Sequence, residues 1–204
     1  MQTGNTIILA LGASNQPEGH PNQWLEALIA ILSFFIGAFS TSRISNLLGP
    51  LRRSTLGLSF FVQGALIAIA AALVQAEIVP GLHPDSTEDF LQLVPLAMLS
   101  FQAGAQCIAA RHLGFNEIPT TVLTSVYCDL GNDPELFVPL QQNWKRNRRF
   151  IAVVLLLLGA IIGGWLSRTN EGMAAGLWMA SAIKLIISVA WFVWRKDGNQ
   201  KPAT

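Results

Sequence analysis

Residues 150–166 read FIAVVLLLLGAIIGGWL, a stretch of seventeen residues without a charged side chain. At a rise of about 1.5 Å per residue, a helix of this length reaches across most of the roughly 30 Å hydrocarbon core of a bilayer. Four further apolar runs occupy residues 24–42, 55–79, 91–110 and 174–194. The sequence therefore predicts an all-α, polytopic transmembrane helix bundle, in which residues 1–204 form a single integral membrane domain with five complete spans.

The composition agrees with a membrane protein. Charged residues make up 12% of the chain, whereas soluble domains usually carry roughly 25%. Apolar residues make up 51%, and the formal net charge is only +1. Nucleic-acid binding normally requires a concentrated basic surface, so we expect no nucleic-acid partner and take the lipid bilayer as the principal partner.

The positions of the basic residues predict an orientation. Eleven of the thirteen Lys and Arg residues fall in segments 43–53 and 111–149 and at the C-terminus, Arg168 falls on the opposite side, and Lys184 lies inside a run. Cytoplasmic loops carry an excess of Lys and Arg, so these segments and the C-terminus are expected in the cytoplasm. The sequence does not indicate which cellular membrane holds the protein.

Weak internal repetition indicates how the spans are organised. Thr3 precedes Gly37 by 34 residues, and Thr124 precedes Gly159 by 35. Residues 3–11 and 120–130 are apolar but too short to span, which favours re-entrant or interfacial elements. If the run 91–110 opens a second half, each half has three helices, and the halves form an inverted repeat of the kind found in secondary transporters. The first half would then begin upstream of Thr3, so residues 3–11 are expected to be a partial N-terminal segment.

Several short motifs carry a family resemblance. They are MQTGNT at residues 1–6, GAQ at 104–106, AARHLG at 109–114, TTVLT at 120–124 and DL at 129–130. In this order they resemble the YoaK-like family of six-span membrane proteins, a domain-of-unknown-function family with the number 1275. The resemblance covers nearly the whole chain and implies that a complete helix precedes the Thr-Gly-Asn element. It implies a supposed transport role and no defined substrate.

Lys184 is the sharpest functional candidate, because it lies in the middle of the run 174–194. An ammonium at the bilayer centre costs about 2.5–3.5 kcal/mol on insertion scales. Lys184 could contact a solute or proton in a cavity, or extend its side chain to the membrane surface. It could also hydrogen-bond to backbone carbonyls and so hold the helices together. Gln63, Gln102 and Gln106 either form interhelical hydrogen bonds or face Lys184 across a central cavity.

The two short elements and the glycines supply the remaining candidates. If both short elements enter the membrane, Thr3, Asn5, Thr121 and Thr124 could line a pathway, since irregular backbone at depth needs protein or water around it. Small residues let helices approach closely, so packing roles are expected for Gly37, Gly159 and Gly163, with a hinge as the alternative. The acids at positions 129, 133 and 135 are expected in a solvated loop.

Signatures of enzymes, metals and cofactors are lacking in the sequence. His20, His83 and His112 fall in three separate segments, without the spacing of a metal site. The Ser181-x-x-Lys184 pattern matches some hydrolases, but it lies within a span and lacks the companion motifs. We therefore expect no enzymatic activity, no cofactor and no metal.

Two functions from different classes fit these features. The leading one is transport of an unknown small solute, with Lys184 and the glutamines in its pathway. The alternative is a membrane scaffold or regulatory subunit that transports nothing and binds a second copy or other helices through its glycine-rich faces. A wet cavity reached by Lys184 would favour the first, and a dry bundle with Lys184 bonded to carbonyls would favour the second.

Overall fold

The computed structural model describes residues 2–14, 22–79, 90–115, 123–169 and 172–193, and these residues are helical apart from their connections. The elements in chain order are α1 (Gln2–Gly12), α2 (Gln23–Leu48), α3 (Arg53–Gln75), the short 3-10 helix η1 (Phe90–Gln92), α4 (Leu93–His112), α5 (Leu123–Gly131), α6 (Trp144–Leu166) and α7 (Gly172–Val193). The predicted all-helical fold is confirmed.

Five of the described helices are long and apolar enough to cross a membrane: α2, α3, η1 with α4, α6 and α7. They overlap the five predicted runs, and α6 ends at Leu166 as predicted, but other helix ends differ from the ends of the apolar runs. Helix α2 continues to Leu48, six residues past the predicted end at residue 42, and it stops where Gly49 takes a φ of +95° before Pro50. A positive φ is open to glycine without a Cβ clash, so the break follows backbone chemistry and not hydropathy. Helix α3 ends at Gln75, four residues before the predicted end at 79.

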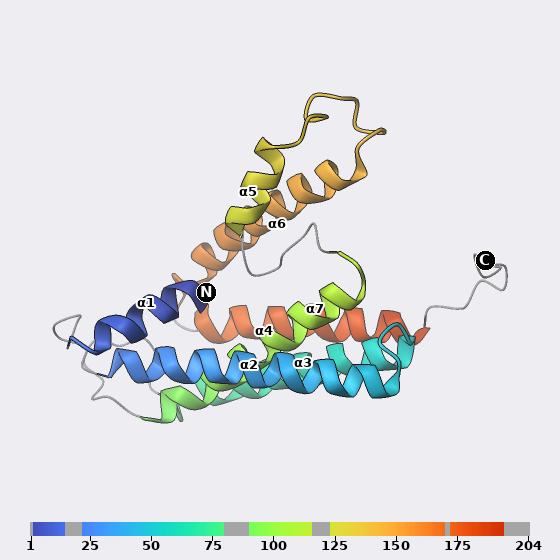
Figure 1. Ribbon diagram of the computed structural model, residues 1–204. Coiled ribbons are helices and arrows are strands. Elements are labelled where there is room, and N and C mark those ends of the chain that lie inside the picture. The colour runs from blue at the N-terminus through green and yellow to red at the C-terminus, as the bar shows by residue number, and fades with distance from the viewer. Residues whose placement is uncertain (1, 15–21, 80–89, 116–122, 170–171, 194–204) are drawn as a thin grey trace.

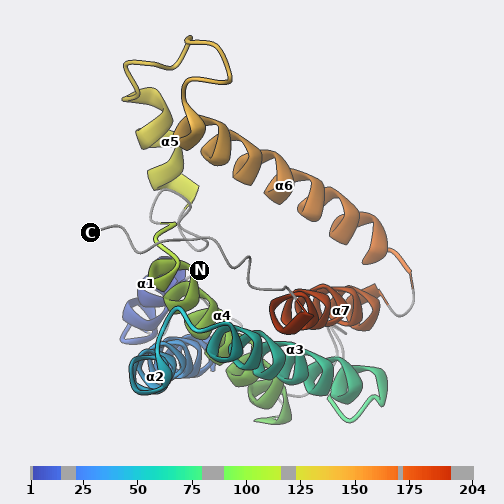
Figure 2. The same ribbon diagram turned by 90° about the vertical axis from the view of Figure 1, so that its right-hand side faces the viewer.

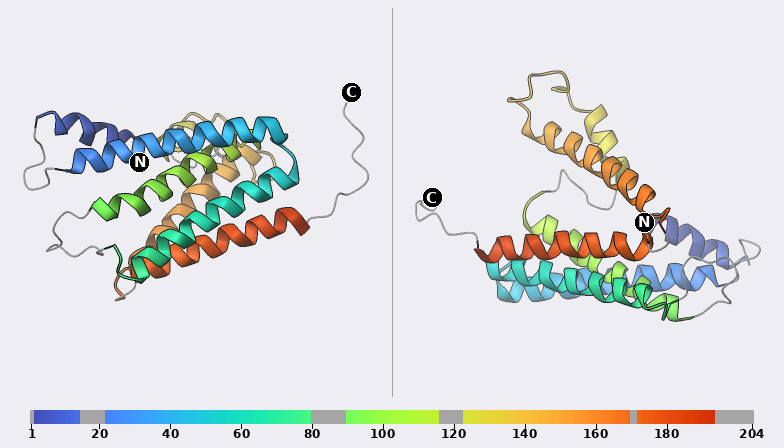
Figure 3. Two further views of the ribbon diagram at one scale, coloured as in Figure 1. Left: turned by 90° about the horizontal axis from the view of Figure 1, so that it is seen from below. Right: turned by 180° about the vertical axis from the view of Figure 1, so that it is seen from behind.

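Four of these helices lie side by side in one layer, in the order α2, α4, α3, α7, and α1 packs on the outer side of α2 (Figure 1; Figure 3, left). The most extensive packing joins α3 with α7 and α2 with α4. Helix α6 diverges from this layer and meets it near the α6–α7 connection, while α5 packs along α6 (Figure 2). Of the described residues of α6, Arg146 alone is buried.

Among the described helices, a short helix followed by two long ones occurs twice, as α1–α2–α3 and as α5–α6–α7. In each set the short helix packs on the long helix that follows it. This order matches the two sets predicted from the Thr3–Gly37 and Thr124–Gly159 spacings. The inverted relation between the two halves stays a prediction.

Glycine permits the backbone contact between α2 and α4. A Cβ at Gly37 would lie 2.1 Å from the carbonyl oxygen of Phe101, and a Cβ at Gly104 would lie 2.2 Å from that of Phe34. Any larger residue would collide with the backbone of the neighbouring helix. The two helices can approach this closely because each presents a glycine to a carbonyl of the other, which is how small residues act in membrane helix pairs.

Serine hydroxyls join α3 to α7. The Ser181 Oγ donates to the carbonyl of Gly64 at 2.9 Å, and the Ser188 Oγ donates to the carbonyl of Gly57 at 2.8 Å. Both serines are buried. Because a hydroxyl in hydrocarbon has no water to bond, these two contacts fix the register of α7 against α3.

Candidate polar site between three spans

Lys184 lies near the middle of α7 and reaches two other helices. Its Nζ donates to the Oε1 of Gln63 on α3 at 2.5 Å and to the Oε1 of Gln106 on α4 at 2.6 Å. We call Lys184, Gln63 and Gln106 the central site. Helices α4, α3 and α7 follow one another in the layer (Figure 3, left), so Lys184 bonds both to the adjacent helix α3 and to the next helix, α4.

The serine register places Lys184 at this point. Ser181 and Ser188 lie three residues before and four residues after Lys184, so helical spacing puts all three on the same side of α7. The two serines bond to α3, and the lysine is therefore directed toward α3 as well. The two bonds from serine hydroxyls to backbone carbonyls thus fix the position of Lys184 along α3.

Gln63 is the most enclosed member of the central site, with 1% of its surface exposed. Its Nε2 donates to the Ser59 hydroxyl at 3.1 Å, one turn earlier on α3, while its Oε1 accepts from Lys184. The Ser59 contact orients the amide so that its oxygen faces the ammonium. A carbonyl dipole aimed at a cation stabilises the charge where water is scarce.

An aromatic ring completes the surroundings of the ammonium. The Phe60 ring centroid lies 5.7 Å from the Lys184 Nζ, within the range of a cation–π contact. Phe60 was missed by the sequence reasoning, because a phenylalanine in an apolar run carries no signal of its own. Its position becomes apparent only when α7 is placed against α3.

The positive charge of the central site has no acidic partner within the described part of the chain. The ion pairs found there join Arg149 to Asp129 and to Asp133, far along the sequence from α7. The contacts of Lys184 are with two neutral amides and a ring. An ammonium held this way keeps its formal charge uncompensated.

Gln102 lies one turn before Gln106 on α4, and its Oε1 is buried without a hydrogen-bond partner among the described residues. An amide oxygen enclosed in this way loses its hydration without recovering a bond, which costs about 1–3 kcal/mol. Buried polar groups of this kind call for an explanation. The sequence predicted Gln102 as a candidate, but not that its oxygen would lack a donor.

The other predicted pathway residues lie elsewhere. Thr3 is exposed on α1, and the Asn5 side chain donates to Gln2 Oε1 at 3.0 Å within the same helix. Thr124 is exposed on α5, and Thr121 lies outside the described residues. Among the described helices, α1 packs on α2 and α5 on α6, so neither brings these side chains to Lys184.

The three predicted packing glycines have different surroundings. Gly37 is buried against α4. Gly159 and Gly163, on α6, would place a Cβ with nothing within 4 Å among the described residues. The packing role of these two glycines stays a prediction.

The α5–α6 connection is held by polar contacts, and of the three acids expected in a solvated loop Glu135 is exposed there, Asp133 is half-buried there, and Asp129 is exposed at the end of α5. Asn143 caps α6 by accepting from the backbone N–H of Arg146 at 3.0 Å, and it donates to the Asp133 carboxylate at 3.0 and 3.2 Å. The Arg146 guanidinium donates to the carbonyls of three loop residues: Glu135, Leu136 and Val138. An Asn immediately before a long apolar helix is a helix-start signal that could have revealed this cap.

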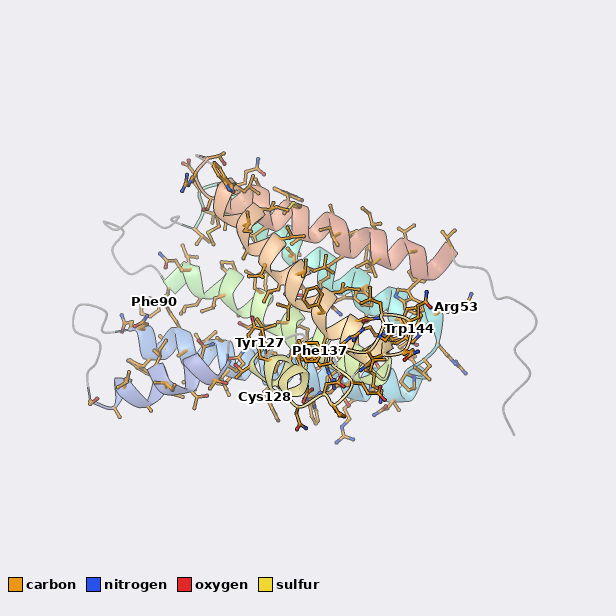
Figure 4. All side chains as sticks on the ribbon, turned by 90° about the horizontal axis from the view of Figure 1, so that it is seen from above. Arg53, Phe90, Tyr127, Cys128, Phe137 and Trp144 are labelled. Carbon is orange, nitrogen blue, oxygen red and sulfur yellow. The ribbon has the colours of Figure 1, made fainter. Side chains whose placement is uncertain are left out.

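Asp133 is held in its ionised form by this network. The backbone N–H of Glu135 first, then the Asn143 amide and the charges of Arg149 and Arg146, lower the pKa of Asp133 below its ordinary value, while slight burial opposes them. The bond from Glu135 N–H measures 2.9 Å. Aromatic side chains project from the same end of the molecule, including Phe137 and Trp144 (Figure 4).

Comparison with known proteins identifies the family without assigning an activity. Neither the search of curated proteins nor the search of solved structures gives a match. The profile of the family described as "Protein of unknown function (DUF1275)" matches residues 1–190, which include the whole central site and all of the helices except the last three residues of α7. The chain therefore belongs to the DUF1275 family.

Proposed function

We propose that this protein moves a small solute across a membrane and that the solute contacts the central site. The observation that carries the proposal is an ammonium near the middle of α7, bonded to side-chain amides from two other spans. Helix packing alone does not require a charge, because neutral Ser and Gln side chains supply interhelical bonds without the insertion cost of about 2.5–3.5 kcal/mol. Ionisable residues within spans commonly mark substrate or ion pathways.

The hydrogen bonds of Lys184 favour a contact with a solute over a role in holding the helices together. A lysine bonded to backbone carbonyls would be tied to the helix backbone itself, whereas Lys184 bonds to two side-chain oxygens. An incoming group can therefore replace one amide without breaking a helix. The proposal includes no enzymatic step and no cofactor.

We also infer that the C-terminus lies in the cytoplasm. The support is the distribution of basic residues, eleven on one set of segments against Arg168 on the other. A cysteine-accessibility assay on variants with a single added cysteine at each side would test the orientation. Labelling of the C-terminal end by an impermeant reagent from the outside of intact cells would contradict it.

Uptake by proteoliposomes tests the transport proposal. A panel of labelled small solutes is offered to vesicles that hold the wild type, Lys184→Met or the control Lys145→Met, which removes the same charge from an exposed position at the start of α6. We expect uptake of at least one solute, loss with Lys184→Met and retention with Lys145→Met. Equal uptake by the folded Lys184→Met variant would overturn the role of the central site.

The uncovered face of α6 favours a second function, a membrane scaffold or regulatory subunit. A Cβ added at Gly159, Gly163 or Gly164 would meet no other described residue within 4 Å, and Arg146 alone of the α6 residues is buried. Helices associate in lipid through such small-residue faces. Covalent cross-linking in membranes tests this function: a cross-linked species lost in Gly159→Ile and Gly163→Ile would support it, and uptake without any cross-linked species would favour transport.

A further inference from the structure

We propose that the central site binds a small monoanion that also carries a hydroxyl donor, the chemistry of a short hydroxycarboxylate. This inference deepens the proposed function and rests on it for the site. It draws on two groups that the helix packing leaves unsatisfied: the charge of Lys184 and the buried oxygen of Gln102.

The first step is charge balance. Lys184 carries one positive charge, and no carboxylate among the described residues pairs with it. A ligand with one negative charge would neutralise the site, which is strongly favoured where water is scarce. A zwitterion would leave the lysine charge uncompensated, and a dianion would leave a net negative charge in the span.

The second step is the donor count at the ammonium. Lysine has three N–H donors, and two of them go to Gln63 and Gln106. The third is available to a carboxylate oxygen in a charge-assisted bond, the strong class of hydrogen bond. The Phe60 ring beside the ammonium adds an apolar contact that suits a short carbon chain better than a fully hydrated ion.

The third step concerns a second hydrogen-bond acceptor on α4, the side-chain oxygen of Gln102. The Gln102 Oε1 is buried and accepts from no described residue. Gln102 precedes Gln106 by four residues, a rise of about 6 Å, so helical spacing puts the two residues on the same side of α4. A ligand that bonds to Lys184 through a carboxylate can reach this oxygen with a hydroxyl if only a few carbons separate the two groups. A halide or a simple carboxylate lacks this donor and would leave Gln102 unsatisfied.

The distance of Lys184 from both ends of α7 indicates whether the anion is a lipid headgroup or a free solute. Lys184 is nine residues from the end of α7 at Val193 and twelve from its start at Gly172, about 14 and 18 Å along the helix axis. A lipid headgroup stays at the interface, so the ligand is a free solute. Anionic lipids should therefore not compete for the site.

Equilibrium dialysis of the full chain in phosphatidylcholine nanodiscs tests the ligand class. The probes are glycolate and acetate, which differ by one hydroxyl, with chloride and glycine as competitors. We expect glycolate to bind about tenfold more tightly than acetate, because acetate leaves the buried oxygen unpaired. Chloride and glycine should compete weakly, and added phosphatidylglycerol should not compete.

Two variants and a control test whether Lys184 binds the acids and whether Gln102 produces the preference for glycolate. Lys184→Met should abolish binding of both acids. Gln102→Leu should remove the preference, so that glycolate and acetate bind equally. Gln75→Leu is the matched control, because Gln75 is exposed on α3 and bonds to Trp178 outside the central site at 2.8 Å. The control should keep the tenfold preference.

Each result decides the proposal. Equal binding of the two acids by the wild type, or a preference that survives Gln102→Leu, overturns it. If Lys184→Met does not fold, as judged by its elution profile, the wild-type preference and the Gln102→Leu variant still decide. Selective glycolate binding without uptake would reject transport but keep the ligand class. Uptake of another solute without glycolate binding would reject the ligand class but keep transport.

Discussion

Replacement of Gly37 by alanine should weaken the α2–α4 pair by an amount that the backbone distance sets. The new Cβ would lie 2.1 Å from the Phe101 carbonyl oxygen, whereas ordinary contact begins at 3.4 Å. The difference between these two distances, 3.4 minus 2.1, requires the helices to move apart locally by 1.3 Å. A gap larger than about 1 Å forfeits more than about half of the dispersion energy between neighbouring atoms.

The expected magnitude combines two opposing effects. Overpacking a close contact costs about 1–3 kcal/mol, and alanine in a helix interior regains about 0.5–1 kcal/mol over glycine. We therefore expect Gly37→Ala to lower the free energy of unfolding by about 1–2 kcal/mol. Gly104→Ala should have a similar effect, because its Cβ would lie 2.2 Å from the Phe34 carbonyl oxygen.

Gly159→Ala is the matched control, since the same substitution in α6 meets nothing within 4 Å among the described residues. This variant should be neutral or gain about 0.5–1 kcal/mol. The assay is unfolding by sodium dodecyl sulfate in mixed micelles, followed by tryptophan fluorescence. An equal loss in Gly159→Ala and Gly37→Ala would refute the reasoning, because the clash would then not be what distinguishes the two sites.

Four further substitutions test the contacts that fix the layer and the α5–α6 connection. Ser181→Ala and Ser188→Ala should each lower the unfolding free energy by about 0.5–1.5 kcal/mol, and the losses should add, since the two bonds lie about 10 Å apart along α7. Arg146→Lys should cost about 1–3 kcal/mol and increase proteolysis of the α5–α6 connection, because one ammonium cannot reproduce a planar fork whose Nη1 contacts three carbonyls while its Nε and Nη2 donate to the Asn147 Oδ1. The stabilisation from ionised Asp133 should be complete above the ordinary carboxyl pKa of 3.8 and disappear as the pH falls through the lower pKa of the folded state. Asp133→Asn should remove this part of the acid dependence of melting.

The outcomes that would contradict these predictions are distinct. A Ser181→Ala, Ser188→Ala double variant no less stable than either single variant would mean that the hydroxyl bonds do not set the register. Unchanged proteolysis in Arg146→Lys would mean that the guanidinium does not hold the connection. Identical acid melting of Asp133→Asn and the wild type would show that this carboxylate is not the group that titrates.

Much of the fold could be predicted from the sequence, because the bilayer sets the length of a span and leaves its backbone no water to bond. Apolar runs such as 150–166 had to be helical, since a backbone in hydrocarbon must satisfy its own hydrogen bonds. Helix ends were less predictable. At Gly49 and at Asn143 the helix boundary depends on a single φ angle or on a capping side chain, and hydropathy contains neither.

The sequence by itself determined that the chain is a polytopic helical membrane protein and that Lys184 and the span glutamines were its exceptional polar residues. Only the tertiary structure decided that Lys184 meets Gln63 and Gln106, that Phe60 stands beside them, and that Gln102 keeps an unpaired oxygen. The physical reason is that apolar composition fixes how many helices cross a membrane. Which faces meet depends on small contacts, a glycine against a carbonyl or a serine hydroxyl across two spans, whose partners lie more than a hundred residues apart in the α3–α7 pair.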